Sequence, residues 1–368
     1  MFTVNQFEDD YCMLKYDAAS EHSQVPWMPL QGTKIPLYWL GSRSALDNGA
    51  CGRLSCTPTE DQTLLDSLFL AQWEDCAWKG FLRYDVTACE LKVIDGRRNF
   101  VAQLNEGWNL NNFLKQNPFT SKCMKMHREW LLFGIASGEQ TNPKIIHSAT
   151  IPDGASLVIV NANPVEYGHV FLVPRGLNSL SQLMDARALE MVARVSVEIN
   201  NSSFRVFYDY SSSANHPYFQ ACYFANPLPV ELMSVVAIHG GQKLEGLHIY
   251  EVKDYPVKAF LFIGNGNLKI LIEVVVNICS WLQDQMVPYS MLISDCGTKM
   301  YLFPKRLMVG SSLSAWECGG YIVFKDRFEF DQATEEAVME RLGALSLDDE
   351  CFSTVKQLCC SVASKLAT

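Results

Sequence analysis

Hydrophobic residues recur at helical spacing in several segments of the chain. Apolar residues recur at this spacing within residues 57–79, after a capping-type segment at 59–61, and predict a helix. Gly80 predicts its end. The same spacing predicts helices over residues 179–200, 268–285, 332–342 and 350–367. Residues 129–135 also indicate helix, before a loop that contains Gly and Pro. Helical segments are therefore spread along most of the chain.

Runs rich in β-branched and aromatic residues lie between the predicted helices. Residues 83–94 and 99–104 flank Asp95-Gly96, a strong turn signal, and predict a hairpin. Further strands are predicted at 156–161, 169–173, 204–210, 218–224, 258–263, 289–294, 299–303 and 321–324. The succession strand, strand, helix, strand, strand thus occurs before residue 225 and again, more loosely, after residue 257.

This repeated succession predicts an α+β fold of pseudo-duplicated antiparallel sheets with flanking helices. We expect a first half over residues 31–245 and a second α+β half over 246–368, packed on the first. Residues 1–30 lack periodicity and mix acidic, polar and aromatic side chains, so we expect a poorly ordered or loosely docked N-terminal arm.

Length and charge narrow the classes of partner. With 368 residues, 48% of them hydrophobic, the chain is long enough to bury a full core. Its net charge of −10, without a run of Lys or Arg, argues against nucleic acid and membrane surfaces, because both attract clustered positive charge. The N-terminal region is acidic, unlike a secretion signal, and apolar runs such as 259–263 are too short to span a bilayer. We therefore expect a cytoplasmic protein, with the nucleus as a further location.

The thirteen cysteines do not form a recognisable ligand set, because the chain contains no Cys-x-x-Cys pair. Their odd number and apolar neighbours, as at Cys89, Cys222 and Cys279, favour reduced and mostly buried thiols. We expect neither a metal site nor a cofactor.

The most informative segment is residues 215–221, with the sequence NHPYFQA. In a strand, His216, Tyr218 and Gln220 would share one face, because side chains alternate between the two faces of a sheet. The intervening residues Pro217 and Phe219 would point to the other face. One face of this strand therefore carries the candidate catalytic side chains, and the other face packs into the core.

Similar stretches of one known family occur in the same order along residues 35–362. These stretches are WED at 73–75, FLRYDVTACELKV at 81–93, FVAQLNEG at 100–107, NPVEYGHVFLVP at 163–174, NHPYFQA at 215–221, NPLPVE at 226–231, YPV at 255–257 and ISDCG at 293–297. On these residues the chain resembles the GDP-hexose phosphorylases, in particular the plant GDP-L-galactose phosphorylases of ascorbate biosynthesis. These are distant relatives of galactose-1-phosphate uridylyltransferase and the histidine-triad proteins, so the resemblance implies a histidine-triad-like fold.

The resemblance also implies a mechanism. In the family, the central histidine of a His-x-His-x-Gln strand attacks the α-phosphorus of a GDP-hexose, and phosphate then releases GDP from the guanylyl-histidine. Tyr218 stands at the position of that nucleophile, between His216 and the amide of Gln220, which steadies phosphoryl oxygens. A tyrosine with its unperturbed pKa of about 10 is only about 0.1% ionised at pH 7, an unfavourable contribution of roughly 4 kcal/mol. A guanylyl-tyrosine would also be a less reactive phosphodiester.

A second departure from the family lies just before this strand. The family has a Tyr-Asn-Ser-Leu-Gly-type loop that donates to the phosphates, whereas residues 208–213 read YDYSSS. Asp209 would place a carboxylate where the family has an amide, which disfavours a phosphate nearby. Ser211 and Ser212 could still donate hydrogen bonds to an anion, or could form a solvated turn.

Four further residues match positions near the nucleotide. The resemblance implies that Asn161 contacts the ribose hydroxyls and that His169 begins a strand facing the nucleotide, although Asn161 could also serve as a turn residue. Arg83 and Lys92, on the strand predicted at 83–94, could neutralise phosphate or could lie on a solvated face.

Two classes of function follow. In the first, the protein converts GDP-L-galactose and phosphate into L-galactose 1-phosphate and GDP, with catalysis impaired by Tyr218. In the second, it is a non-catalytic pseudoenzyme that binds a guanine nucleotide, or that binds and regulates an active homologue. The resemblance implies a homodimer or a heterodimer with such a homologue. The residue at position 218 separates the two classes, so the sequence leaves enzymatic activity open.

Overall fold

The structure is a computed structural model in which eight ranges of the chain are described. These ranges are residues 34–41, 62–107, 130–138, 142–174, 184–210, 218–238, 246–307 and 313–366. The predicted N-terminal arm at 1–30 and the candidate residues Ser211, Ser212 and His216 lie outside them.

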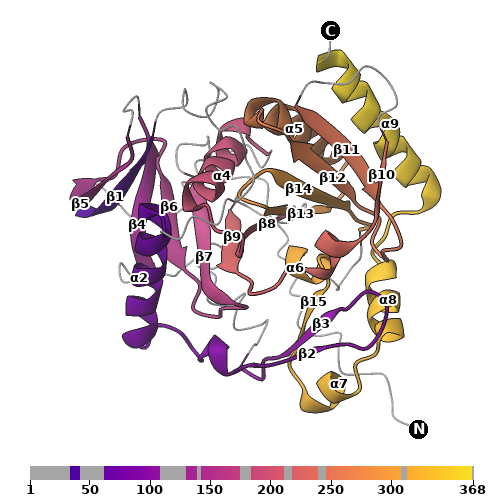
Figure 1. Cartoon of the computed structure of the whole chain (residues 1–368), viewed down its shortest axis with the longest axis horizontal. Coiled ribbons are helices and arrows are strands. Elements are labelled where there is room, and N and C mark those ends of the chain that lie inside the picture. Colours follow the sequence, from indigo (N-terminus) through magenta and orange to yellow (C-terminus); the bar gives the residue numbers. More distant parts are fainter. Residues whose placement is uncertain are drawn as a thin grey trace, which may run out of the picture.

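Within the described residues, twelve strands form one large sheet (Figure 1). Their order across the sheet is β10-β11-β12-β14-β13-β8-β9-β7-β6-β4-β1-β5. Neighbouring strands run antiparallel, except that β1 and β4 run parallel. In chain order the strands are β1 Lys34–Leu40, β4 Leu131–Ser137, β5 Lys144–Thr150, β6 Ser156–Val160, β7 Tyr167–Pro174, β8 Phe204–Tyr210, β9 Phe219–Tyr223, β10 Val235–Ala237, β11 Leu247–Val252, β12 Phe260–Gly264, β13 Tyr289–Ser294 and β14 Lys299–Pro304.

A small sheet and the helices pack on this large sheet. The small sheet has the order β15-β3-β2, with β2 Glu90–Val93, β3 Val101–Leu104 and β15 Tyr321–Phe324. The α-helices are α2 Leu64–Trp78, α4 Ala186–Ile199, α5 Leu268–Asp284, α6 Ala315–Cys318, α7 Arg327–Asp331, α8 Glu335–Gly343 and α9 Asp349–Leu366. Short 3-10 turns occur at Val86–Ala88 and Pro229–Leu232. None of the described helices is long and apolar enough to cross a membrane.

The two halves of the large sheet have corresponding topologies. The strand order β6-β7-β9-β8 in one half matches β11-β12-β14-β13 in the other. Helix α4 connects β7 to β8, and helix α5 connects β12 to β13 in the same way. The halves join where β8 pairs with β13. The fold therefore combines helices with large, mostly antiparallel sheets, as predicted, while an internal duplication stays a prediction that this correspondence supports.

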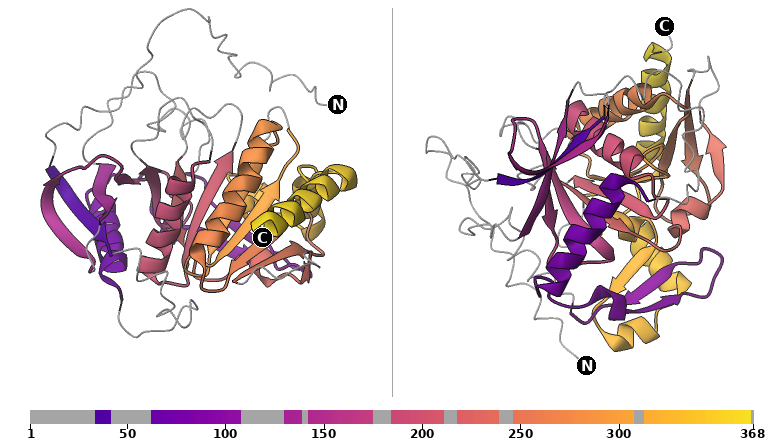
Figure 2. Two further views of the ribbon diagram at one scale, coloured as in Figure 1. Left: turned by 90° about the horizontal axis from the view of Figure 1, so that it is seen from above. Right: turned by 60° about the vertical axis from the view of Figure 1, so that its left-hand side comes forward.

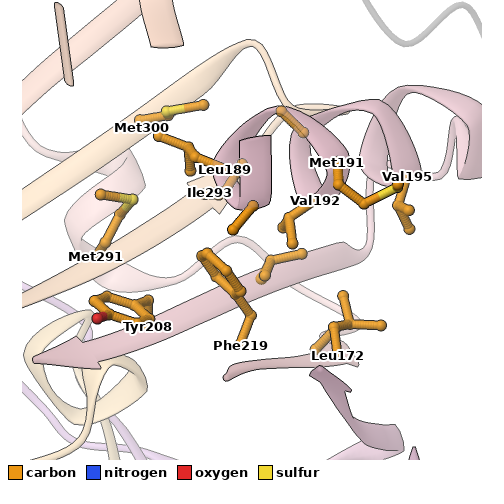
Figure 3. Packing of buried hydrophobic residues seen from close by; sticks show 14 of the residues in the cluster. Leu172, Leu189, Met191, Val192, Val195, Tyr208, Phe219, Met291, Ile293 and Met300 are labelled. Carbon is orange, nitrogen blue, oxygen red and sulfur yellow. The ribbon is translucent and has the colours of Figure 1, made fainter. Parts of the chain in front are cut away.

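One face of the large sheet is covered by helices. Helices α4, α5 and α9 lie side by side along it (Figure 2). Figure 3 shows the packing beneath α4, where Leu189 and Val192 face Phe219 of β9 and Leu172 of β7. Helix α4 is delimited locally, because the Asp185 side chain accepts a hydrogen bond from the Arg187 N–H and Asn200 ends the helix in the left-handed conformation. This packing fixes which side chains of β9 point away from the helices.

The opposite face is divided between the two halves. One apolar core on this face includes Phe303, Leu292 and Tyr301 of the second half, together with residues of the small sheet, α6 and α8, and it extends to Phe207 and Cys222 of the first half. In the first half a smaller cluster contains Leu157, Ile159, Phe171 and Val173. The two clusters meet at the strands β7, β9 and β8, which contribute Phe171, Cys222 and Phe207 to them and carry the candidate site.

The structure corrects several predicted boundaries. Residues 131–137 form strand β4 rather than part of a helix at 129–135, and β4 is buried along nearly its whole length. Helix α2 begins at Leu64, because Thr63 is its N-cap and accepts a hydrogen bond from Asp66 N–H at 3.2 Å. Helix α4 begins at Ala186 rather than near residue 179, although residues 175–183 lie outside the described ranges.

Further corrections concern the small sheet and the C-terminal helices. The predicted hairpin is present, but its first strand begins at Glu90, because Asp85 accepts hydrogen bonds from Thr87 and caps a 3-10 turn. The helix predicted at 332–342 begins at Glu335 after the N-cap Thr334, with the short helix α7 before it. The pattern did not predict β1, β5, β10, β11, α6 or α7.

Candidate active site

Gln220 lies in the middle of the large sheet and faces away from the helices. Its neighbour Phe219 packs under α4 (Figure 3), so strand alternation turns Gln220 to the other face. Phe171 of β7 and Phe207 of β8 stand opposite Gln220 on the two neighbouring strands. The side chain is 7% exposed. A polar amide is therefore held between two aromatic residues in a nearly closed environment.

His169 reaches the same face through an irregularity in β7. The pairing of β7 with β9 shifts register between Tyr167 and Val170, on either side of His169. Gly168 permits this conformation, because its φ is +71° and a Cβ there would lie 2.6 Å from the ring of Tyr223. The bulge and the glycine thus set the direction of the His169 side chain.

Hydrogen bonds fix the His169 imidazole on two sides. The Val165 backbone N–H donates to Nδ1 at 2.9 Å. On the other side, Nε2 lies 3.1 Å from Gln220 Oε1. Asn161 Nδ2 lies 3.3 Å from Nε2 and 3.5 Å from Nδ1. His169, Gln220 and Asn161 therefore form one contiguous polar cluster.

The cluster is held by residues from distant elements. The Asn161 side chain accepts a hydrogen bond from the Asn163 N–H at 3.0 Å, which fixes its amide. Trp73 of α2 donates its indole N–H to the His169 carbonyl at 3.2 Å. Trp316 of α6 contacts the His169 ring edge-on, with 5.8 Å between ring centroids. Elements of both halves therefore fix the position of one histidine.

Burial determines the charge of this histidine. His169 has no exposed surface, and this desolvation lowers its pKa from 6.5 to about 3, although the hydrogen bond to Gln220 acts in the opposite direction. The imidazole is therefore neutral at physiological pH. It cannot supply positive charge to a phosphate, and it acts through its hydrogen bonds.

Tyr218 precedes β9 and lies beside an apolar surface. It is half-buried and packs against the cluster of Leu157, Ile159 and Val173. Its ring meets Phe171 edge-on, with a centroid distance of 5.3 Å. The phenol ring is thus seated on the same face of the sheet as Gln220.

Asp209 belongs to a separate buried cluster at the junction of the two halves. Ser290 Oγ donates to one carboxylate oxygen of Asp209, and the Ala315 N–H donates to the other at 3.1 Å. Lys305 Nζ lies 3.6 Å from the carboxylate and donates to Ser290 Oγ at 2.7 Å. The Lys305 side chain is 7% exposed, against 27% for Asp209. The carboxylate predicted to disfavour a phosphate is therefore at least partly neutralised by a buried lysine.

The two predicted phosphate-binding cations lie in different places. The backbone N–H of Arg83 donates to the Ala162 carbonyl at 3.0 Å, next to Asn161 in the chain. The Arg83 side chain is exposed. Lys92 lies on the small sheet, where Nζ sits 4.6 Å from the Phe330 ring centroid and donates to the Asp331 carbonyl at 3.2 Å. The structure brings Arg83 close to the polar cluster through its backbone, but it does not bring Lys92 there.

Comparison with known proteins places this geometry in a family. Residues 64–222 match a family model described as GDPGP1-like, N-terminal domain, and residues 229–366 match GDPGP1-like, C-terminal domain. GDP-L-galactose phosphorylase 1 of Arabidopsis thaliana is 33% identical over 363 residues, covering 89% of this chain and 80% of the relative. The chain belongs to the GDP-hexose phosphorylase family.

GDP-D-glucose phosphorylases of the same family are similar at lower identity. GDP-D-glucose phosphorylase 1 of Danio rerio is 22% identical, covering 84% of this chain and 95% of the relative. Among solved structures, yeast Ap4A phosphorylase Apa2 in complex with AMP superposes with a TM-score of 0.53 over 77% of this chain and 96% of its own. At 15% identity this likeness shows the fold alone.

Some residues of the site could not be found from the sequence of a GDP-hexose phosphorylase. Trp316 follows His169 by nearly 150 positions, and no local pattern connects them. Val165 acts through its backbone N–H, which carries no sequence signal. Lys305 was likewise not predicted, although a lysine after an apolar strand was the available clue.

Proposed function

We propose that this protein is a GDP-L-galactose phosphorylase-like member of its family that binds a guanine nucleotide and in which Tyr218 impairs guanylyl transfer. The observation that carries the proposal is the phenol at the predicted nucleophile position, packed edge-on against Phe171. GDP-L-galactose is the proposed sugar nucleotide, because the relatives at 33% identity bear that name. A role in ascorbate biosynthesis is part of the same proposal.

The chemical reason is the difference between imidazole and phenol as nucleophiles. Imidazole has an unperturbed pKa of about 6.5 and is largely neutral at pH 7, whereas a phenol is about 0.1% ionised there. Guanylylation must also be reversible enough for phosphate to discharge the intermediate, and a phosphodiester to tyrosine is less labile than a phosphoramidate to histidine. Both half-reactions are therefore slower with Tyr218.

Nucleotide binding is supported by the polar cluster that persists beside Tyr218. Gln220, His169 and Asn161 are buried together in a sheet whose neighbouring side chains are largely apolar. Burying polar groups costs free energy unless they are hydrogen-bonded, so a cluster of this kind is favoured where a ligand uses it. Ser211, Ser212 and His216 are proposed contacts that follow from the resemblance alone.

Phosphorolysis of GDP-L-galactose tests the catalytic half of the proposal. Release of L-galactose 1-phosphate is measured for the wild type, for Tyr218→His and for Tyr250→His. Tyr250 lies on β11 in the second half and is half-buried like Tyr218, so its substitution is a matched control. Tyr218→His is expected to gain on the order of a thousand-fold in rate, as the ionised fraction of phenol suggests. If the wild type released L-galactose 1-phosphate as fast as Tyr218→His, the proposed impairment of catalysis by Tyr218 would be refuted.

Calorimetric titration with GDP tests the binding half. The wild type is expected to bind GDP whether or not it turns over the sugar nucleotide. Absence of GDP binding by a folded wild-type protein would refute retained nucleotide binding.

Association with an active homologue is a second candidate function. Strand β10 lies at one edge of the large sheet, and Val235, Val236 and the nearby Leu232 are 37%, 51% and 60% exposed. Exposed apolar edge strands are sites of strand pairing between chains. Mixing the protein with Arabidopsis GDP-L-galactose phosphorylase 1 in sedimentation experiments should give a heterodimer that Val236→Lys weakens. Sedimentation as separate species would contradict this candidate.

A cytoplasmic or nuclear location is also part of the proposal, and imaging of a fluorescent fusion would test it.

A further inference from the structure

Three hydrogen-bond donors converge on the carboxylate of Asp209, near the end of β8. Ser290 Oγ donates to Oδ1, and the backbone N–H of Ala315 donates to Oδ2 at 3.1 Å. Lys305 Nζ lies 3.6 Å from Oδ1 and donates to Ser290 Oγ at 2.7 Å. Hydroxyl, backbone N–H and ammonium groups are donors with which proteins bind oxyanions. We call this set of donors the Lys305 site, and its occupant in the structure is the Asp209 carboxylate.

Contacts with other residues also hold these donors. Lys305 Nζ donates to the Leu313 carbonyl at 3.1 Å, which directs the ammonium. Ser290 has no exposed surface, and the Lys305 side chain is 7% exposed. The Asp209 side chain is 27% exposed, so solvent reaches the site from the side of the carboxylate. The Lys305 site is therefore a set of largely buried donors with one open side.

Asp209 carries the negative charge that balances the buried ammonium of Lys305. Glu317 lies close enough to interact with both charges, but its carboxylate accepts hydrogen bonds from Arg341 at 2.7 Å and from the Ser314 N–H at 3.0 Å. Without Asp209, the charges of Lys305, Glu317 and Arg341 would sum to one positive charge. A buried ammonium without a counter-ion is costly, so an empty Lys305 site would favour an anion from solution.

The Lys305 site lies on the same face of the sheet as the predicted nucleophile position. Phe207 and Gln220 are paired on β8 and β9. Asp209 stands two residues after Phe207 and therefore points to the same face. Tyr218 stands two residues before Gln220, and its ring is seated on this face against Phe171. Because the two strands are antiparallel, Asp209 and Tyr218 lie toward the same end of the pair.

We infer that Lys305, Ser290 and the Ala315 N–H form a binding site for inorganic phosphate, which Asp209 occupies in the wild type and thereby closes to the ion. Because the carboxylate is tethered to β8, it competes with free ions at a high effective concentration. Phosphate is the co-substrate of the reaction that the resemblance implies, so this contact is a second block on phosphorolysis, separate from Tyr218. The Lys305 site is independent of the proposed nucleotide binding.

Truncation of Asp209 should open the Lys305 site to phosphate. Inorganic phosphate is titrated calorimetrically, at constant ionic strength, into the wild type, Asp209→Ala, Asp209→Asn and the double variant Asp209→Ala/Lys305→Met. The wild type gives the baseline for phosphate bound elsewhere. Asp209→Ala is expected to bind phosphate about ten-fold more tightly than the wild type, as a gained hydrogen bond between charged groups implies. The double variant should lose this gain.

Asp209→Asn is the matched control, because its amide removes the charge but still fills the space. It should stay close to the wild type in phosphate affinity. If Asp209→Asn bound phosphate as tightly as Asp209→Ala, the carboxylate would act by repulsion rather than by occupying the site, and the inference would be overturned. The same conclusion would follow if Asp209→Ala bound no more tightly than the wild type, or no more tightly than the double variant.

Thermal denaturation provides a readout for variants that are too unstable to titrate. Phosphate should raise the melting temperature of Asp209→Ala more than that of the wild type, whereas chloride at equal ionic strength should not. Asp209→Ser is a second truncation, used in the same way if Asp209→Ala does not fold. Equal rises with and without Lys305→Met would overturn the inference.

The GDP titration of the wild type separates this site from the proposed function. A protein that binds GDP, but whose Asp209→Ala variant gains no phosphate binding, would overturn the Lys305 site alone. A wild type that does not bind GDP, but whose Asp209→Ala variant gains phosphate binding, would overturn retained nucleotide binding and support the Lys305 site.

Discussion

Strands β9 and β14 hold corresponding places in the two halves of the large sheet, yet they differ on the face away from the helices. β9 directs Gln220 to a fully buried histidine. β14 directs Tyr301 and Phe303 into an apolar core shared with the small sheet and α8. The helix-facing residues of both strands, among them Phe219 and Met300, belong to one common core. The strands therefore agree where they support the fold and differ where one of them carries the candidate site.

The difference indicates what the fold requires at this position. The second half shows that the place of β9 can be filled by apolar side chains, which gain free energy on burial without needing partners. We therefore expect that the polar cluster of Asn161, His169 and Gln220 in the first half serves a ligand rather than stability.

Truncation of a core side chain in the second half should lower the stability of the protein and leave ligand binding at the candidate site unchanged. Phe303 is fully buried, so Phe303→Ala is expected to lower the free energy of unfolding by about 3–5 kcal/mol. GDP affinity of the folded protein should not change. Urea denaturation and calorimetric titration measure the two quantities. Loss of GDP affinity in the folded variant would mean that the two regions are not independent.

Breaking the ion pair of Asp209 and Lys305, at the junction of the halves, should have the next largest effect on stability. Asp209→Asn leaves the buried Lys305 without its carboxylate, which is expected to cost about 3 kcal/mol, at the low end for a buried pair because Asp209 is partly exposed. Combining it with Lys305→Met should recover most of this loss. Urea denaturation of the single and double variants gives the coupling. Strictly additive effects would show that the charges do not interact.

Acidification should destabilise the folded protein through the buried imidazole of His169. His169 has a pKa of about 3 in the folded protein and about 6.5 when unfolded, so the unfolded state binds more protons between these values. Stability from this residue is complete above pH 6.5 and falls as the pH decreases. Between pH 6.5 and 5 the wild type should therefore lose about 2 kcal/mol relative to His169→Gln.

The control for this pH effect is His248→Gln, at an exposed histidine of β11. Its stability should follow the wild type across the same pH range. A wild type and His169→Gln with parallel pH profiles would show that His169 is not buried as a neutral group.

The smallest effect is expected at Lys92. Its ammonium lies over the Phe330 ring at 4.6 Å, so Lys92→Met should cost about 0.5–1 kcal/mol of stability. GDP affinity should stay unchanged, because Lys92 lies on the small sheet away from Gln220. Thermal denaturation and titration test both points. A marked loss of GDP affinity would restore Lys92 as a phosphate contact.

The sequence predicts best those elements with a clear local pattern. The strands around residues 160, 170, 207 and 221 and the helix at Leu268–Asp284 were found, because their alternation or helical period is undisturbed. The pattern predicts helix where strand β4 lies, since a strand buried on both faces has no alternation to distinguish it. β1 contains Pro36, and β10 has three exposed residues at a sheet edge, so neither carries a strong strand signal.

The candidate site was predicted only in part, for a different reason. Motif resemblance named Asn161, His169 and Gln220, and the structure places them in contact. Their tautomers and amide orientations depend on backbone N–H groups whose positions follow from the tertiary fold. The pairing of Asp209 with Lys305 joins residues almost a hundred positions apart and is invisible to any local pattern.

Detection of a covalent intermediate shows directly whether Tyr218 can act as a nucleophile. The wild type and Tyr218→His are mixed with GDP-L-galactose in the absence of phosphate, and their intact masses are compared. We expect a guanylyl adduct on Tyr218→His and none on the wild type. An adduct on the wild type that maps to Tyr218 and disappears when phosphate is added would contradict it.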